Sequence, residues 1–371
     1  MDRLGLFVAS LLDASSRAYA SGAVTRLVES GAGAGHGFRG LVADVQGRIE
    51  SLASSLAVGL PALLAHEASW AAAAWSARGA DLDLLRAEYE FLRAELVERL
   101  PSETTPLVRE HLAAAARAVA APEVPEATIL VDGLPMVEAA RGFLVAVLEG
   151  RRDDAIRIVL DAVESGASAL DVQRHVLGRV QAEMGRMWQI GEVNVAEEHL
   201  GTRVVEEALV HLRTYLPREP WNGRTVLVAA VSGNAHQLGA RVVADRFESA
   251  GWRALFLGAD TPNDDLVAAV GHFGAHLVAL SAGMAVDTRA VADFADALHR
   301  EHARVPLLVG SRLLGRRRPV ARGRGRRLRA ERGRGDRCSG AGAPKLSPFG
   351  SWGACVFLSR RGAAQRPRGE T

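Results

Sequence analysis

The chain has 371 residues, 48% of them apolar, which is enough for two or three domains with buried cores. Its net charge of +2 is unevenly spread, because residues 312–337 hold twelve arginines against one glutamate and one aspartate. Both cysteines, Cys338 and Cys355, lie near the C-terminus, so the composition argues against a disulfide framework or a cysteine zinc site and favours a reducing, cytoplasmic location. No apolar run reaches membrane-spanning length, and residues 4–12 fit the apolar side of a first helix better than a signal peptide.

Residues 1–121 are predicted to form a helical interaction or sensory region. Apolar residues recur at spacings of three and four over residues 84–100, and the glycine-rich stretch 29–40 is compatible only with a loop. The histidines of this region are scattered without the spacing of metal ligands, and no catalytic constellation is found. The expected role is contact with a regulatory protein partner.

A proline-punctuated linker at residues 122–135 precedes a second helical block, residues 136–216. The block divides into four amphipathic segments with short connections, which predicts a four-helix bundle. The segments are residues 136–150, 151–166, 168–188 and 194–216.

The hydrophobic period changes after residue 217, and short apolar runs begin to alternate with helical segments. This alternation predicts a doubly wound parallel sheet covered by helices on both faces, in a domain spanning residues 223–311. The expected strands are residues 224–231, 252–258, 275–282 and 305–311, and the expected helices are residues 237–250, 263–273 and 287–301. Ligands of such sheets bind at the carboxyl ends of the strands.

The turn after the first expected strand reads Asn234-Ala-His236-Gln-Leu-Gly239. It resembles the Asp(or Glu)-x-His-x-x-Gly motif of the cobalamin-binding domain of corrinoid proteins, a flavodoxin-like or Rossmann-like fold. The resemblance implies that His236 binds cobalt from the lower face in place of the cofactor's own base. It further implies that Ser281 in "LVALSAGM" meets the displaced nucleotide tail, and that Gly239 and Gly310 line the channel of that tail.

Asn234 departs from this motif. In the family, the acidic residue at this position is the partner of the histidine and is backed by a serine; here Asn234 and Ser281 are the expected supporting groups. An amide can still accept a hydrogen bond from the imidazole but carries no charge. We therefore expect a less electron-rich His236 and a changed cobalt potential, which disfavours methyl transfer.

A second match lies in the helical block, where Trp188 is followed after nine residues by Glu198-His199. This pattern resembles the helical cap of cobalamin-dependent light-sensing transcriptional regulators. The resemblance implies that Trp188 shields the adenosyl group on the upper face and that the Glu-His pair helps to hold it. Taken alone, the same residues read as a core tryptophan and a solvated helix turn. Gln189 departs from the family, which has a histidine there.

The tail, residues 312–371, has no apolar period of either kind. Three readings compete: a disordered Arg/Gly tail that binds nucleic acid, a solvated extension without function, and a frameshifted translation. We favour the last, because G- and C-rich codons read out of frame give this composition and the sheet domain ends in mid-fold. On this reading the sheet domain is truncated at residue 311 and has an irregular C-terminal part.

These patterns predict a cobalamin-binding sensory or regulatory protein rather than an enzyme, dependent on adenosylcobalamin and responsive to light, which signals through its N-terminal helices. The alternative is a corrinoid methyl carrier of a methyltransferase system, which would bind methylcobalamin. A third reading is a helical scaffold that has lost the cofactor. Direct binding of nucleic acid is not expected, because residues 1–121 lack a basic recognition helix and a wing. No membrane association is expected, and a homo-oligomer is compatible with this organisation.

Overall fold

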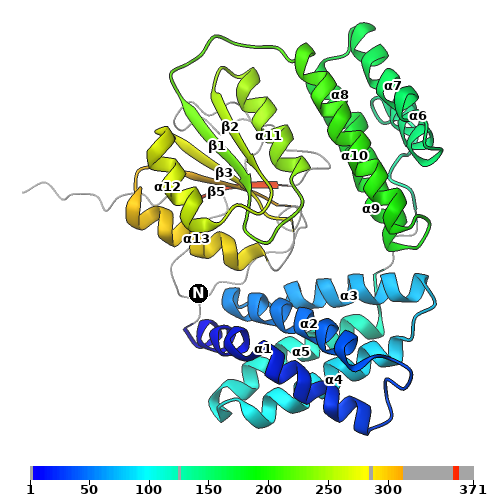
Figure 1. Cartoon of the computed structure of the whole chain (residues 1–371), viewed down its shortest axis with the longest axis vertical. Helices are drawn as coiled ribbons and strands as arrows, with labels where there is room; N and C mark the ends of the chain where they lie inside the picture. Colours follow the sequence, from blue (N-terminus) through cyan, green and yellow to red (C-terminus); the bar gives the residue numbers. More distant parts are fainter. Residues whose placement is uncertain (1–2, 124–126, 284–286, 312–353, 359–371) are drawn as a thin grey trace, which may run out of the picture.

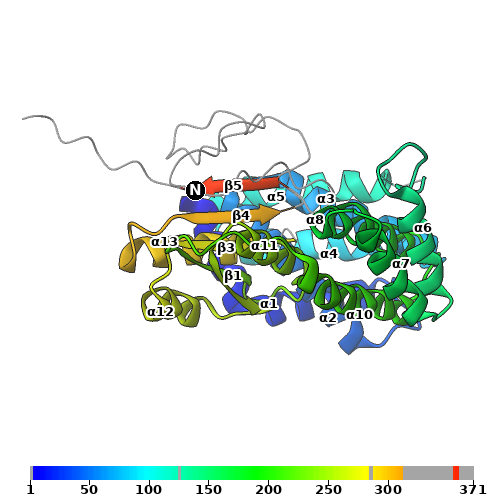
Figure 2. The same cartoon turned by 90° about the horizontal axis from the view of Figure 1, so that it is seen from above.

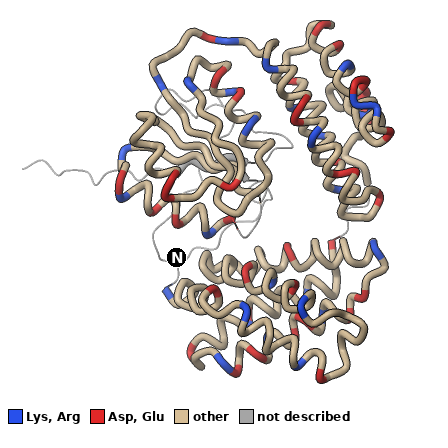
Figure 3. Tube along the Cα trace, viewed as in Figure 1, with Lys and Arg blue, Asp and Glu red and all other residues tan. Residues whose placement is uncertain are grey.

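The structure, a computed structural model, describes residues 3–123, 127–283, 287–311 and 354–358. The helices of the N-terminal third lie together at one end of the molecule (Figure 1). A helical bundle and a sheet domain lie side by side above them, as Figures 1 and 2 both show. Basic and acidic residues are interleaved along the helices of all three regions (Figure 3).

The N-terminal region packs its helices around an apolar core of its own. The glycine-rich stretch separates the first two helices as a loop, and Gly31, Gly33 and Gly35 adopt the positive φ angles that this loop requires. The elements are α1 (Arg3–Glu29), α2 (Phe38–Val58), α3 (Pro61–Ala77), α4 (Leu82–Arg99), the short 3₁₀ turn η1 (Ser102–Thr104) and α5 (Thr105–Ala120).

The bundle follows the expected segments closely and is built on one continuous core. Its elements are α6 (Val137–Leu148), α7 (Arg152–Glu164), α8 (Ala169–Val172), the turn η2 (Gln173–Leu177), α9 (Gly178–Gln189), α10 (Val195–Leu212) and the 3₁₀ turn η3 (Arg213–Tyr215). The third expected helix is not uniform, because η2 is a π-helical turn between α8 and α9. Such a turn inserts an extra residue into the helix and rotates the side chains that follow it.

The sheet domain has the predicted architecture, with four parallel strands in the order β2-β1-β3-β4. The strands are β1 (Thr225–Ala230), β2 (Arg253–Gly258), β3 (Leu277–Ser281) and β4 (Leu307–Ser311). Helix α11 (Leu238–Ser249) covers one face, and α12 (Asn263–Phe273) with α13 (Asp287–Glu301) covers the other. Both faces are apolar because each is covered, which explains the continuous apolar runs of the sequence.

The tail differs from its expected irregular character at one place. Residues Ala354–Leu358 form a fifth strand, β5, which pairs antiparallel with β4. The sequence "ACVFL" is a short run rich in apolar residues. The outer edge of β4 carries backbone donors and acceptors that a further strand can pair, and β5 satisfies them. The remaining residues of the tail, on which the three competing readings rest, lie outside the described residues.

The bundle and the sheet domain share apolar and polar contacts across α11. Leu238 and Val242 of α11 are buried in the core of the bundle, and burial of such side chains contributes roughly 1.5–3 kcal/mol each. The buried amide of Gln173, on the π-helical turn η2, donates to Asp245 of α11 at 2.8 Å. The π turn therefore places a polar side chain toward the sheet domain, and the two regions are packed as one module.

Candidate cobalamin site

His236 lies in the turn between β1 and α11, at the carboxyl ends of the parallel strands. Its side chain is exposed at this edge. The turn begins with Gly233, whose φ of 80° is in the region that favours glycine. The fold therefore presents His236 where a parallel sheet binds its ligands.

Asp260, which follows β2, fixes this turn from the neighbouring strand. Its carboxylate accepts a hydrogen bond from the backbone N–H of Gly233 at 2.7 Å. Its own backbone N–H donates to the carbonyl of Asn234 at 3.2 Å. Asp260 has a positive φ of 47°, so its backbone adopts an unusual conformation to make both contacts. No motif in the sequence pointed to a role for Asp260.

The side chain of Asn234 contacts the imidazole of His236. The amide is 2% exposed, and its Oδ1 lies 2.7 Å from the backbone N and 3.0 Å from Nδ1 of His236. In the described part of the chain, Nε2 of His236 has no hydrogen-bond partner. The ring is thus fixed through one nitrogen, and the other points away from that contact.

The sequence did not identify the next group in this chain of contacts. The Nδ2 of Asn234 donates to Oδ2 of Asp287 at 2.8 Å, and both side chains are buried. Asp287 is the first residue of α13 and lies 53 positions from Asn234 in the chain. No local motif joins two residues at such a separation, so only the fold brings them together.

The remaining predicted residues of the sheet domain lie at the same edge. Ser281 ends β3 and pairs with Ala230 of β1 on one side and Gly310 of β4 on the other. Gly239 is in the first turn of α11. Each of the three is half-buried. Their roles toward a nucleotide tail stay predictions.

The donor set at this edge fits a corrin. A corrin would supply most of the ligands of its cobalt ion itself, so the single imidazole of His236 would suffice as the protein ligand. A second-sphere hydrogen bond to Nδ1, such as Asn234 makes, orients Nε2 as the ligand atom. Among the described residues, no group of three or more His, Cys, Asp or Glu side chains lies together as a site for a bare metal ion.

Trp188, the predicted upper wall, lies at the end of α9 in contact with the N-terminal region. Its ring stacks on that of Trp70 from α3, with centroids 5.1 Å apart and planes inclined by 21°. The guanidinium of Arg78, just after α3, lies 4.6 Å from the centroid of the same ring and donates to the carbonyl of Trp188. Neither partner could be predicted from the sequence, because no pattern in residues 1–121 indicates a contact with the bundle.

Glu198 and His199 are positioned by the start of α10. Asn194 caps this helix in a reciprocal capping box with Glu197, which sets the pair in the first turn and a half. Glu198 accepts from Thr202 at 2.9 Å, and Nδ1 of the exposed His199 lies 2.7 Å from the carbonyl of Val195. The structure joins neither residue to His236 by a hydrogen bond among the described residues. Their role in holding an upper ligand stays a prediction.

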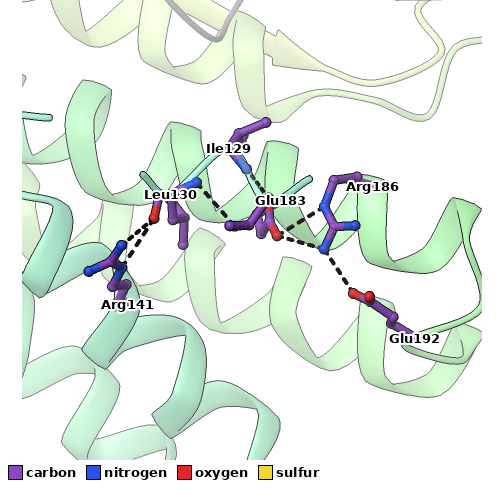
Figure 4. A network of polar contacts seen from close by, with 7 residues as sticks. Ile129, Leu130, Arg141, Glu183, Arg186 and Glu192 are labelled. Atoms are coloured by element: carbon purple, nitrogen blue, oxygen red, sulfur yellow. Dashed lines mark hydrogen bonds and ion pairs between the residues drawn. The ribbon is translucent and has the colours of Figure 1, made fainter. Parts of the chain in front are cut away.

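The segment before the bundle is fastened to α9 by a buried carboxylate (Figure 4). Glu183 accepts from the backbone N–H of Ile129 at 2.9 Å and from Arg186, which also reaches Glu192. Burial by itself raises the pKa of Glu183, but the Arg186 guanidinium and the Ile129 amide hold that pKa below its ordinary value. Arg141 binds the carbonyl of Leu130 from the other side. These contacts tie α9 to the segment before the bundle at Glu183, five residues before Trp188.

Two family models, both described as a B12 binding domain, match this chain. One covers residues 139–213, which is the bundle, and the other covers residues 224–313, which is the sheet domain. No helix among the described residues has the length and apolar character of a membrane span.

Curated relatives include two repressors of Myxococcus xanthus. The HTH-type transcriptional repressor CarH is 29% identical over 175 residues, which cover 47% of this chain and 57% of the relative. The HTH-type transcriptional repressor CarA is 32% identical over 169 residues, covering 45% and 54%. The methanol–corrinoid protein of Methanosarcina barkeri is 22% identical over 125 residues, covering 34% and 48%. The chain thus matches about half the length of these relatives.

Among solved structures, the monomethylamine corrinoid protein of Methanosarcina barkeri matches 48% of this chain and 85% of its own, with a TM-score of 0.43 at 18% identity. A cobalamin-binding protein from Desulfitobacterium hafniense matches 46% of this chain and 82% of its own, with a TM-score of 0.26 at 19% identity.

Proposed function

We propose a sensory function for this chain, in which the N-terminal helices respond to the state of bound cobalamin. B12 binding domain models match both the helical bundle and the sheet domain. The observation that carries this proposal is the contact of Trp188 with Trp70 and Arg78. Trp188 is expected to face the cofactor, yet it also contacts the N-terminal region, in which no cofactor-binding residue was predicted. Any movement of the Trp188 ring must change its contacts with α3.

The lower face of the site has its own connection to the N-terminal region. Helix α13 begins with Asp287, which supports Asn234, and continues to Arg289, which forms an ion pair with Asp13 of α1. Helix α13 also packs against α2. The N-terminal helices therefore contact both the cap and the sheet domain, and a change in the separation of these two parts would alter at least one contact.

In this proposal, different residues serve the lower and the upper side of the site. His236 supplies an imidazole to the lower face, oriented by Asn234. Trp188, Glu198 and His199 face the upper ligand in this proposal, and the exposed apolar side chains of Val195 and Leu200 flank the Glu-His pair. Cobalamin, when bound, would supply a cobalt ion with an exchangeable upper ligand. We propose adenosylcobalamin as the bound form and light as the signal that removes its upper ligand, on the similarity to CarH and CarA.

The test loads the full chain with adenosylcobalamin in the dark and follows amide hydrogen exchange before and after illumination. We expect a histidine-ligated absorption spectrum and a change in exchange within residues 61–78, which contain α3. A spectrum in which the cofactor keeps its own base would overturn the site. Identical exchange in α3 for the free, loaded and illuminated protein would overturn the sensory role.

The similarity to the methanol–corrinoid protein favours a second candidate, a corrinoid methyl carrier. It predicts tight binding of methylcobalamin and transfer of the methyl group to or from a methyltransferase, without a response in α3. Transfer at a rate comparable to that of a corrinoid protein assayed beside it would support this candidate over the sensory one.

A further inference from the structure

The buried contacts behind His236 form a directed series rather than a single pair. Asp287 accepts from Nδ2 of Asn234 at 2.8 Å, and Oδ1 of the same amide faces Nδ1 of His236 at 3.0 Å. Oδ1 also accepts from the backbone N–H of His236 at 2.7 Å. Asn234 is 2% and Asp287 3% exposed, so water does not compete freely for these groups.

The chemistry of the three groups fixes the direction of every hydrogen bond in this series. A carboxylate only accepts, so it must face the NH₂ side of the Asn234 amide. The amide oxygen must then face His236, where it can only accept. The imidazole nitrogen opposite an acceptor has to carry the hydrogen, which leaves the lone pair on Nε2. Asp287 and the backbone N–H of His236 therefore hold the Asn234 amide in one orientation from its two ends, and that orientation selects the tautomer of His236.

The position of Asp287 favours its charged form. It is the first residue of the 15-residue helix α13. The N-terminal end of a helix stabilises a carboxylate, because the free backbone N–H groups and the aligned peptide dipoles present positive charge there. In this chain the carboxylate is that of Asp287, and it reaches the imidazole through one more hydrogen bond than an acidic residue at position 234 would.

We propose that Asp287 is a positioning residue for the cobalt site, which keeps His236 in the tautomer with Nε2 free to bind the metal. This inference rests on the proposed function, because a free Nε2 on His236 serves the protein only if that nitrogen binds cobalt. Its first test needs no cofactor, so the two can fail separately. In the family pattern described above, an acidic residue contacts the histidine and a serine backs it. Here the carboxylate and the neutral partner have exchanged places.

The first experiment measures the ¹⁵N chemical shifts of the His236 ring in the cofactor-free protein at pH 8, assigned by comparison with His236→Gln. We expect Nδ1 protonated and Nε2 unprotonated in the wild type, and a mixture of tautomers in Asp287→Ala. A matched control is Asp245→Ala, which removes another buried carboxylate that accepts from an amide, Gln173. The control should leave the His236 shifts unchanged. A wild-type ring with the proton on Nε2, or an unaltered tautomer in Asp287→Ala, would overturn the proposal.

The second experiment exchanges the charges. Asn234→Asp restores the family motif but places two carboxylates at a 2.8 Å contact, so we expect it to weaken cobalamin binding. Adding Asp287→Ser should restore binding, because a serine hydroxyl can donate to the new carboxylate. Asp287→Ala alone should lower cobalamin affinity about tenfold to hundredfold, as loss of a group behind a metal ligand typically does. Full affinity in the single Asn234→Asp variant, or no recovery in the folded double variant, would contradict the proposed role.

Discussion

The lower and upper sides of the proposed cobalamin site are held by different parts of the molecule. His236 is positioned by groups of its own domain: Asn234 in the same turn, and behind it Asp287. Trp188 is positioned by another domain, through Trp70 and Arg78. A metal ligand has to stay in one geometry, which buried hydrogen bonds inside one domain provide. A wall that reports a change has to exchange contacts, and a half-buried interface between domains permits that exchange.

The largest expected effect is on the lower side. His236→Ala removes the sole side-chain cobalt ligand of this proposal, so the absorption spectrum of the loaded protein should lose its histidine-ligated form. We expect affinity for cobalamin to fall about 100-fold or more, in line with the loss of a metal ligand and its supporting contact. Titration followed by absorption measures both. His272→Ala, at an exposed position on α12, is the control and should bind as the wild type does. Unchanged binding in His236→Ala would contradict the assignment of the cobalt ligand to the lower side.

Lowering the pH should reduce the folding stability of the N-terminal region through His111, which lies outside the bundle and the sheet domain. Burial lowers the pKa of His111 from 6.5 to about 4, and its Nδ1 contacts Ser55 at 2.7 Å. The unfolded chain binds a proton at His111 below about pH 6.5 and the folded chain does not, so folding stability is fully present above that pH and falls as the pH decreases toward 4. Between pH 7.5 and 5.0 the loss should be on the order of 2 kcal/mol.

Denaturant unfolding followed by helical circular dichroism at the two pH values measures this loss. His111→Gln removes the titrating group and should flatten the pH dependence of the free energy of unfolding. An equal loss in the wild type and in the variant would show that other groups are responsible.

Gly191→Ala tests the interface itself. Gly191 follows α9 with a φ of 75°, and an added Cβ would lie 3.2 Å from the carbonyl oxygen of Ala77 at the end of α3. We expect a cost of about 1–2 kcal/mol from backbone strain together with displacement of α3. Gly150→Ala carries a similar strain at a φ of 71° but meets no atom within 4 Å, so it serves as the control. Amide exchange in α3 should rise in the first variant alone, and equal exchange in both would mean that the contact does not hold α3.

The smallest expected effect comes from Trp70→Ala. Loss of the ring stacked on Trp188 should cost about 0.5–1.5 kcal/mol, the usual range for an aromatic pair. We expect cobalamin affinity to stay near the wild-type value while the response of α3 to illumination is lost. Trp221, 70% exposed, provides the control substitution Trp221→Ala. A retained response in Trp70→Ala would place the signal on another contact, with Arg289 and Asp13 as the next to examine.

Much of the fold follows from local patterns. The expected helices at residues 263–273 and 287–301 coincide with α12 and α13, because continuous apolar strands and amphipathic helices leave different periods in the sequence. The π-helical turn at Gln173–Leu177 could not be foreseen, since its residues suit an ordinary helix and the contact with Asp245 on α11 is tertiary. The strand Ala354–Leu358 was missed for a related reason. A run of five apolar residues does not by itself predict a strand, and this one is formed by pairing with the edge of β4.

The candidate site divides in the same way. A short turn motif after a strand suffices to point to His236, and chain order alone places Ser281 and Gly310 at the same sheet edge. Asp287 and Trp70 have no motif of their own, because each acts through a residue far away in the chain.

By itself, the sequence determined the element types, the parallel sheet and the histidine at its carboxyl edge, since each depends on residues close together in the chain. The tertiary structure alone decided which groups stand behind that histidine and which helix covers Trp188. The physical reason is that side-chain hydrogen bonds and ring stacking act over a few ångströms, whatever the number of residues between the partners. Their partners are chosen by how the domains pack, and no local pattern records that choice.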